Sequence, residues 1–237
     1  EEGIFSLSLG TSLAAEGMIA AALDLLALDN RLSSTQVDFL LRSPFVGGAR
    51  EEQHSRALLD RERRQVGPET VPLALLARWA REGIRGIGRS SRLSQILTAF
   101  EAKSPDRRQR LPGEWAGHFA RLLAALGWPG DPPLDSRGYQ VLGAWRELTA
   151  KFASLDAVSV PMGLGRALSL LRRLAGKEIF QIEGPPGRIQ IMGHLEAAGL
   201  RFDHLWIMGL HEEALPSVPR PNPFLPLPLQ QQRGMPH

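Results

Sequence analysis

The chain contains no cysteine, which excludes disulfides, thiolate metal ligands and a cysteine nucleophile. The lack of cysteine also agrees with a reducing compartment. No apolar run is long enough to cross a bilayer, and the N-terminus lacks the basic, apolar and small-residue regions of a signal peptide. These absences predict a folded protein that has no membrane partner, and we expect it to be cytoplasmic.

Lysine is scarce, occurring only at positions 103, 151 and 177 among 28 basic residues. The other basic residues are arginines, which keep their charge far above neutral pH, so the sequence pI is about 9.9 although the net charge is only +3. Arginine binds phosphates with two parallel hydrogen bonds, which suits a nucleic-acid surface. A GC-rich coding bias would produce the same preference without any function.

Hydrophobic periodicity predicts a mainly helical chain. Residues 3–10 alternate apolar and polar side chains between glycines, which indicates a short strand. Ser33 and its neighbours can cap the second helix, and Pro44 should stop it. Apolar residues three or four apart predict helices over 13–28, 34–42, 50–64, 71–83, 92–102, 113–127, 137–154 and 162–175.

Two clusters of proline and glycine, at 127–133 and 183–187, interrupt this pattern and should separate architectural units. After the second break, 188–192 and 204–208 are apolar and predict two strands joined by a connection of about eleven residues, which is short for a parallel crossover. Prolines recur from residue 216 onward, so we expect an extended tail, either docked through Phe224 and Leu225 or disordered.

The stretch Gly83-Ile-Arg-Gly-Ile-Gly-Arg-Ser90 has the spacing of a phosphate-binding loop, but Arg89 stands where that motif has lysine. A phosphate-binding loop follows a buried strand, whereas 73–80 has the pattern of an amphipathic helix. We therefore interpret these glycines as a helix end and a loop. The arginines at 81, 85, 89 and 92 could contact a phosphate backbone, although charges in such loops are usually solvated.

The sequence predicts no catalytic residue, no metal site and no cofactor. None of the six histidines has the helical spacing of a metal-binding pair, and His211-Glu212-Glu213 is better explained as a surface turn. The carboxylates have no spacing that requires a shared cleft. We expect the five tryptophans, at 79, 115, 128, 145 and 206, to pack in the core rather than to stack on bases.

The densest basic run contains Arg107, Arg108 and Arg110 in a predicted loop. This run is the best local candidate for a phosphate contact. The alternative, that the run is only a solvated loop, stays open.

One segment, residues 188–216, resembles the fifth motif region of superfamily I helicases, and most closely that of inactivated members. In active relatives the pattern is Thr-x-His-x-x-Lys-Gly-Leu-Glu followed by an aromatic residue. Gly199, Leu200 and Phe202 match this pattern, whereas the positions of Thr, His, Lys and Glu hold Gly193, Leu195, Ala198 and Arg201. Because the glutamate is associated with the nucleotide ribose, the resemblance implies a catalytically inactive module that does not hydrolyse ATP.

The arrangement is similar to that of the RecC and AddB type subunits of recombination nucleases and of related DNA-repair proteins. Residues 5–13 and 40–45 resemble the entry into the helical insertion of the second helicase domain. The resemblance implies an α/β, predominantly helical fold, in which a helical subdomain is inserted in a partial RecA-like (P-loop NTPase-like) domain. The expected units are an entry strand over 1–13, the helical insertion over 14–180, and the rest of the RecA-like domain over 181–237.

The resemblance also implies that this chain is a fragment. Any vestigial phosphate loop would precede residue 1, and any nuclease domain would follow His237.

We therefore expect a non-catalytic, helicase-like module of a DNA repair or recombination protein, which binds DNA or a nuclease or helicase partner subunit. Arg188, His194 and Arg201 are the candidates for phosphate contact, because the corresponding loop in working relatives lies near the DNA strand. The alternative is a helical protein-interaction scaffold without direct DNA contact, which predicts an apolar rather than a basic exposed patch.

Overall fold

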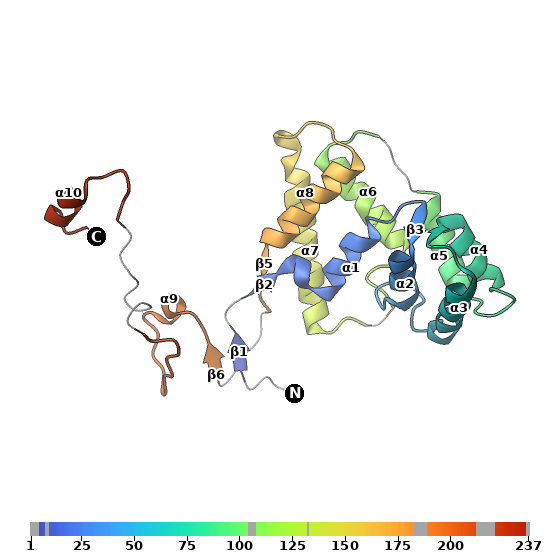
Figure 1. Cartoon of the computed structure of the whole chain (residues 1–237), viewed down its shortest axis with the longest axis horizontal. Helices are drawn as coiled ribbons and strands as arrows, with labels where there is room; N and C mark the ends of the chain where they lie inside the picture. Colours follow the sequence, from blue (N-terminus) through green and yellow to red (C-terminus); the bar gives the residue numbers. More distant parts are fainter. Residues whose placement is uncertain are drawn as a thin grey trace. The chain divides into compact units, whose positions relative to one another are not determined.

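The computed structural model describes residues 5–7 (backbone only), 10–103, 108–131, 133–182, 189–211 and 221–235 (Figure 1). The residues group into two compact units, 1–192 and 193–237, which we describe separately. The described part is predominantly helical with a few short strands, as the sequence predicts. No helix among the described residues is long and apolar enough to cross a membrane.

Each of the eight predicted helical segments contains a helix. The second begins and ends where the sequence predicts, because Ser33 forms a capping box: its hydroxyl accepts from the Gln36 amide at 3.3 Å and its amide donates to the Gln36 side chain at 2.9 Å. The helices are α1 Gly17–Leu25, α2 Ser34–Arg42, α3 Gln53–Val66, α4 Leu73–Glu82, α5 Ser91–Glu101, α6 Pro112–Ala125, α7 Ser136–Ser154 and α8 Leu164–Lys177, with short 3-10 turns η1 at Leu13–Ala15 and η2 at Leu155–Ala157.

The strands in the described part of the chain form three small pairs. β1 (Phe5–Leu7) pairs in parallel with β6 (Ile189–Ile191), which confirms a strand within 3–10 and another within 188–192. β2 (Thr11–Ser12) pairs antiparallel with β5 (Ile179–Phe180), so the chain enters and leaves the helical region side by side. β3 (Arg31–Ser33) pairs antiparallel with β4 (Thr70–Pro72), a pair too short to show as alternation in the sequence.

The core of the first unit lies between its helices. Trp115 is fully buried, donates from its indole to the Met162 carbonyl at 2.7 Å and stacks on Phe119, which in turn stacks on Phe152. Trp145 is buried as well, and Trp79 and Trp128 pack against the core. The prediction that all tryptophans are core residues is wrong for Trp206, which is 89% exposed.

An ionic network centred on buried Asp60 and Arg63 joins α2 to α3. Asp60 accepts hydrogen bonds from Arg42, Arg63 and Arg64, at 2.6 Å, 2.9 Å and 3.2 Å. Asp38 on α2 pairs with Arg63 and Arg64 as well. Burial raises the pKa of Asp60, but the three arginine hydrogen bonds outweigh it, and the pKa lies below its usual value. This network fixes the two helices against each other.

The described residues of the second unit, 193–211 and 221–235, form two short helices, α9 (His194–Ala197) and α10 (Leu227–Gln232). The prediction of a strand over 204–208 is wrong: these residues do not form a strand and pair with none of the described residues, and Leu205, Trp206 and Met208 are exposed. An apolar run of this length becomes a strand only when a neighbouring strand accepts its backbone hydrogen bonds.

The predicted extended tail is wrong for residues 227–232, which form α10. Gln230 holds the start of this helix by donating to the carbonyls of Asn222 and Leu225, at 2.9 Å and 2.8 Å. Pro226 and Pro228 are compatible with the helix because they stand at its start, where no intrahelical amide bond is required. Phe224 beside this helix is 91% exposed.

Candidate nucleic-acid interface

The predicted phosphate contacts are dispersed. Arg107 and Arg188 lie outside the described residues, and Arg108 is exposed. Arg110 is half-buried: its backbone exchanges two hydrogen bonds with Met162, at 3.1 Å and 2.8 Å, and its guanidinium lies 5.7 Å from the centre of the Trp115 ring. Arg110 therefore contributes to packing, because its guanidinium forms a cation–π interaction with the indole ring.

The other predicted contacts belong to the second unit. His194, at the start of α9, and Arg201 are both exposed and contact no described side chain through a hydrogen bond or ion pair. Gly193 is the N-terminal cap of α9, and its amide donates to the Glu196 carboxylate at 3.0 Å. The remaining positions of the helicase-like motif follow closely: Leu195, Ala198, Gly199 and Leu200 are exposed and Phe202 is half-buried.

The glycine-rich stretch 83–90 connects two helices, as the sequence predicts, since α4 precedes it and α5 follows it. The amides of Arg92 and Leu93 at the start of α5 donate to the Glu52 carboxylate, at 2.7 Å and 3.0 Å. A carboxylate of this chain therefore occupies the place that a phosphate takes in a phosphate-binding loop.

A basic face on α8 was missed by the sequence analysis. Arg166, Arg173 and Lys177 are exposed on this helix, and the stretch Leu164–Lys177 contains no acidic residue. None of the three forms an ion pair with a described residue. The opposite side of the helix is apolar and lies in the core; its buried residues are Ala167, Leu168, Leu171 and Ala175. We call Arg166, Arg173 and Lys177 the α8 basic face.

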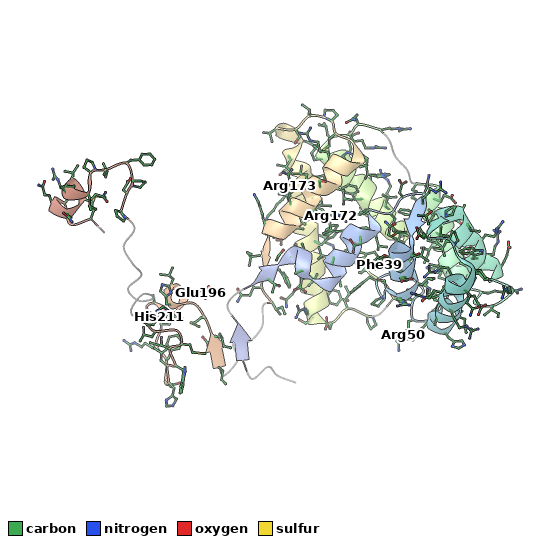
Figure 2. All side chains as sticks on the ribbon, viewed as in Figure 1. Phe39, Arg50, Arg172, Arg173, Glu196 and His211 are labelled. Atoms are coloured by element: carbon green, nitrogen blue, oxygen red, sulfur yellow. The ribbon has the colours of Figure 1, made fainter. Side chains whose placement is uncertain are left out.

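A fourth basic residue of α8 has a partner within the chain. Arg172 donates to the Leu23 carbonyl at 3.2 Å and to the Asp24 carboxylate at 3.4 Å, both at the end of α1. Figure 2 shows Arg172 on the side of α8 nearer to α1, and Arg173 beside it. Arg172 therefore joins two helices, whereas the charge of the α8 basic face is uncompensated by its own helix.

Two glycines of α8 lie on its exposed surface. A Cβ atom added to Gly165 or Gly176 would meet no other atom within 4 Å, so packing within the chain does not require glycine at either position. Glycine inside a helix costs about 1 kcal/mol relative to alanine. Together with exposed Ser169, these glycines leave a strip without bulky side chains beside the charged residues, where the backbone of another molecule can approach the helix closely.

The dimensions of the α8 basic face suit an extended polyanion. With a rise of about 1.5 Å per helical residue, Arg166 and Lys177 are separated by about 16 Å along the axis. This length equals about five base-pair steps of duplex DNA. The sequence signal for this face is the pattern Arg-x6-Arg-x3-Lys in a stretch without acidic residues.

Comparison with known proteins adds no assignment: no family model, no curated protein and no solved structure matches the chain at a significant level.

Proposed function

We propose that the chain is a non-catalytic, helicase-like module of a DNA repair or recombination protein, and that it binds DNA through the α8 basic face. The observation that carries the DNA-binding proposal is the group Arg166, Arg173 and Lys177 on one exposed helix that has no acidic residue. Guanidinium and ammonium groups at this spacing neutralise phosphates and release the counterions that surround DNA.

The helicase-like assignment is supported by the resemblance of residues 188–216 to a motor motif whose functional positions are replaced. The arrangement of the first unit is compatible with it, because β1 and β6 form a parallel pair from the two ends of a helical region. A helical subdomain inserted in a RecA-like domain would have this chain order. The replacement of the motif's glutamate by Arg201 supports a module without ATP hydrolysis.

The chemistry of the face favours the DNA backbone over the bases. The exposed residues of α8 include no aromatic side chain, so bases of a single strand have no ring on which to stack. Contacts from arginine and lysine to phosphates are independent of sequence. We therefore expect duplex and single-stranded DNA to bind with little sequence preference and with strong salt dependence.

A salt titration tests the proposal. Binding of the chain to a duplex and to a single-stranded oligonucleotide is measured at several salt concentrations, for the wild type and for the triple variant Arg166→Gln, Arg173→Gln, Lys177→Gln. Each lost phosphate contact lowers the slope of log affinity against log salt by about 0.9 for duplex DNA. We expect the triple variant to lose between about two and three units of slope.

A matched control variant distinguishes the loss of contacts at the α8 basic face from the loss of net positive charge. The variant Arg31→Gln, Arg121→Gln, Arg146→Gln removes the same charge from three exposed positions on other elements, and it should keep most of the slope. An Arg201→Gln variant tests the loop of the second unit in the same assay. Equal losses in the triple variant and in its control would contradict a DNA site on α8.

One observation favours the scaffold alternative. Leu195, Leu205, Trp206 and Met208 of the second unit are each more than 60% exposed, which is the apolar surface that a protein-binding scaffold predicts. The same titration separates the two functions. If the chain bound no DNA even at low salt, the result would favour the scaffold function, with partner binding through the second unit.

A further inference from the structure

The connection between α4 and α5 contains a two-residue turn with an arginine at its tip. Ile84 and Ile87 exchange two backbone hydrogen bonds, each 3.0 Å long, and Arg85 and Gly86 lie between them. Both tip residues have positive φ, +54° at Arg85 and +77° at Gly86. Two positive φ angles between a doubly bonded pair define a type I′ turn.

Arginine is an unfavourable residue at this position. The first tip residue of a type I′ turn is usually asparagine, aspartate or glycine, because these tolerate the left-handed backbone. Arg85 is the one non-glycine residue with positive φ among the described residues. A residue that opposes its local backbone preference indicates a function that offsets the cost.

Contacts within the chain do not explain this arginine. Arg85 is exposed and forms no hydrogen bond or ion pair with any described residue. Its neighbours do have partners: Arg81 pairs with Glu82 at 3.0 Å, and Arg89 donates to the Glu82 carbonyl at 3.1 Å. The guanidinium of Arg85 is therefore available to another molecule.

The turn is held rigidly. Ile84 is buried, and a Cβ atom at Gly88 would lie only 2.4 Å from the Leu59 amide nitrogen of α3, so this glycine is in direct contact with that helix. The Ser90 amide donates to the Ala80 carbonyl at 2.6 Å, which fastens the end of the connection to α4. Because the turn is already fixed, the backbone of Arg85 and Gly86 loses little conformational freedom when the turn binds another molecule.

We infer that the Ile84–Ile87 turn is a second, arginine-tipped contact for the phosphate backbone of DNA, formed by a different part of the fold from the α8 basic face. This inference depends on the proposed DNA-binding function and extends it. Residues 78–92 contain five arginines and one glutamate, so the surroundings of the tip attract a polyanion. The planar guanidinium can donate two parallel hydrogen bonds to one phosphate.

The variant Arg85→Asn tests the inference without damaging the fold. Asparagine fits the left-handed backbone, so we expect a Tm that is higher by about 1 to 3 °C, measured by thermal unfolding. In the duplex titration, the same variant should bind about three- to tenfold more weakly at low salt, with a slope reduced by about 0.9. Arg85→Gly, which also suits the turn, should weaken binding equally, whereas Arg121→Gln controls for the loss of one charge elsewhere.

The outcomes distinguish this inference from the proposed function. If Arg85→Asn binds duplex DNA as tightly as the wild type while the α8 triple variant binds weakly, the turn is not a DNA contact and the proposed function stands. If the wild type binds no DNA, both are overturned. If Arg85→Asn weakens binding of poly-L-glutamate but not of DNA, the turn recognises an acidic polypeptide and the inference is wrong.

Discussion

Replacing Glu52 with alanine should destabilise the first unit by about 4 kcal/mol, because one carboxylate satisfies two different parts of the structure. Its oxygens accept from the amides of Arg92 and Leu93 at the start of α5, at 2.7 Å and 3.0 Å. They also accept from the Arg56 side chain, at 3.3 Å from Nε and 3.1 Å from Nη2. Alanine removes all four hydrogen bonds at once.

The magnitude follows from the burial of these groups. Loss of a side-chain cap at a helix start costs about 1 kcal/mol. The Arg56 side chain is only 1% exposed, and removing one partner of a buried ion pair costs about 3 kcal/mol or more. Burial lowers the pKa of Arg56, and Glu52 opposes this shift through its hydrogen bond and its charge. Without Glu52, Arg56 would keep its hydrogen bond to the Gly47 carbonyl, at 2.6 Å, but would lose its ion-pair partner.

Urea unfolding of the wild type and Glu52→Ala, followed by circular dichroism, measures the change. Glu52→Gln keeps an acceptor without the charge and should be less destabilised. In the double variant Glu52→Ala, Arg56→Met the buried charge is absent, so it should lose less stability than the two single losses added together. A loss below about 1 kcal/mol for Glu52→Ala would refute the reasoning, because it would mean that Arg56 does not need this carboxylate.

Three further predictions concern stability. The pKa of Asp60 is lower in the folded chain than in the unfolded chain. Ionised Asp60 therefore makes its full contribution to the free energy of unfolding above the unfolded pKa of about 3.9, and this contribution is lost as pH falls through the folded pKa. As pH falls below about 4, the free energy of unfolding of Asp60→Asn should therefore decrease less than that of the wild type, measured by urea unfolding across pH. Gly86→Ala should cost about 1 kcal/mol for its backbone alone, and Gly88→Ala about 3 kcal/mol because its Cβ meets α3, measured by urea unfolding. Ser33→Ala should lower the unfolding free energy by about 1 kcal/mol through loss of the α2 cap, and an unchanged urea midpoint would contradict this.

The helices were predictable because their signals are local. Side chains three or four apart define a buried face without reference to the rest of the chain, and the hydroxyl of Ser33 is close in sequence to the amide that it caps. The β3–β4 pair was not predictable from its two three-residue segments, since it depends on contacts between residues far apart in sequence. The segment 204–208 was mispredicted for a related reason: its apolar composition satisfies the side-chain requirement for a strand, but none of the described residues completes its backbone hydrogen bonds.

The candidate site was harder to predict than the fold. The sequence favours Arg110, in a basic run of a predicted loop, over Arg166, in a predicted helix, but the structure places the first over Trp115 and the second on an exposed helix face. The turn at Arg85 was recognised as a loop, yet its positive φ cannot be read from composition. An arginine can be assigned to packing or to binding only when its neighbours in space are known.

The antiparallel β2–β5 pair joins the two ends of the helical region at one point. Thr11 pairs with Phe180 and Ser12 with Ile179, and the Leu13 amide donates to the Glu178 carbonyl at 2.8 Å. Because this pairing holds the two ends of the helical region together, it fixes the separation of the flanking segments. A change of length in a surface loop of this region is therefore expected to leave the register of β1 against β6 unchanged.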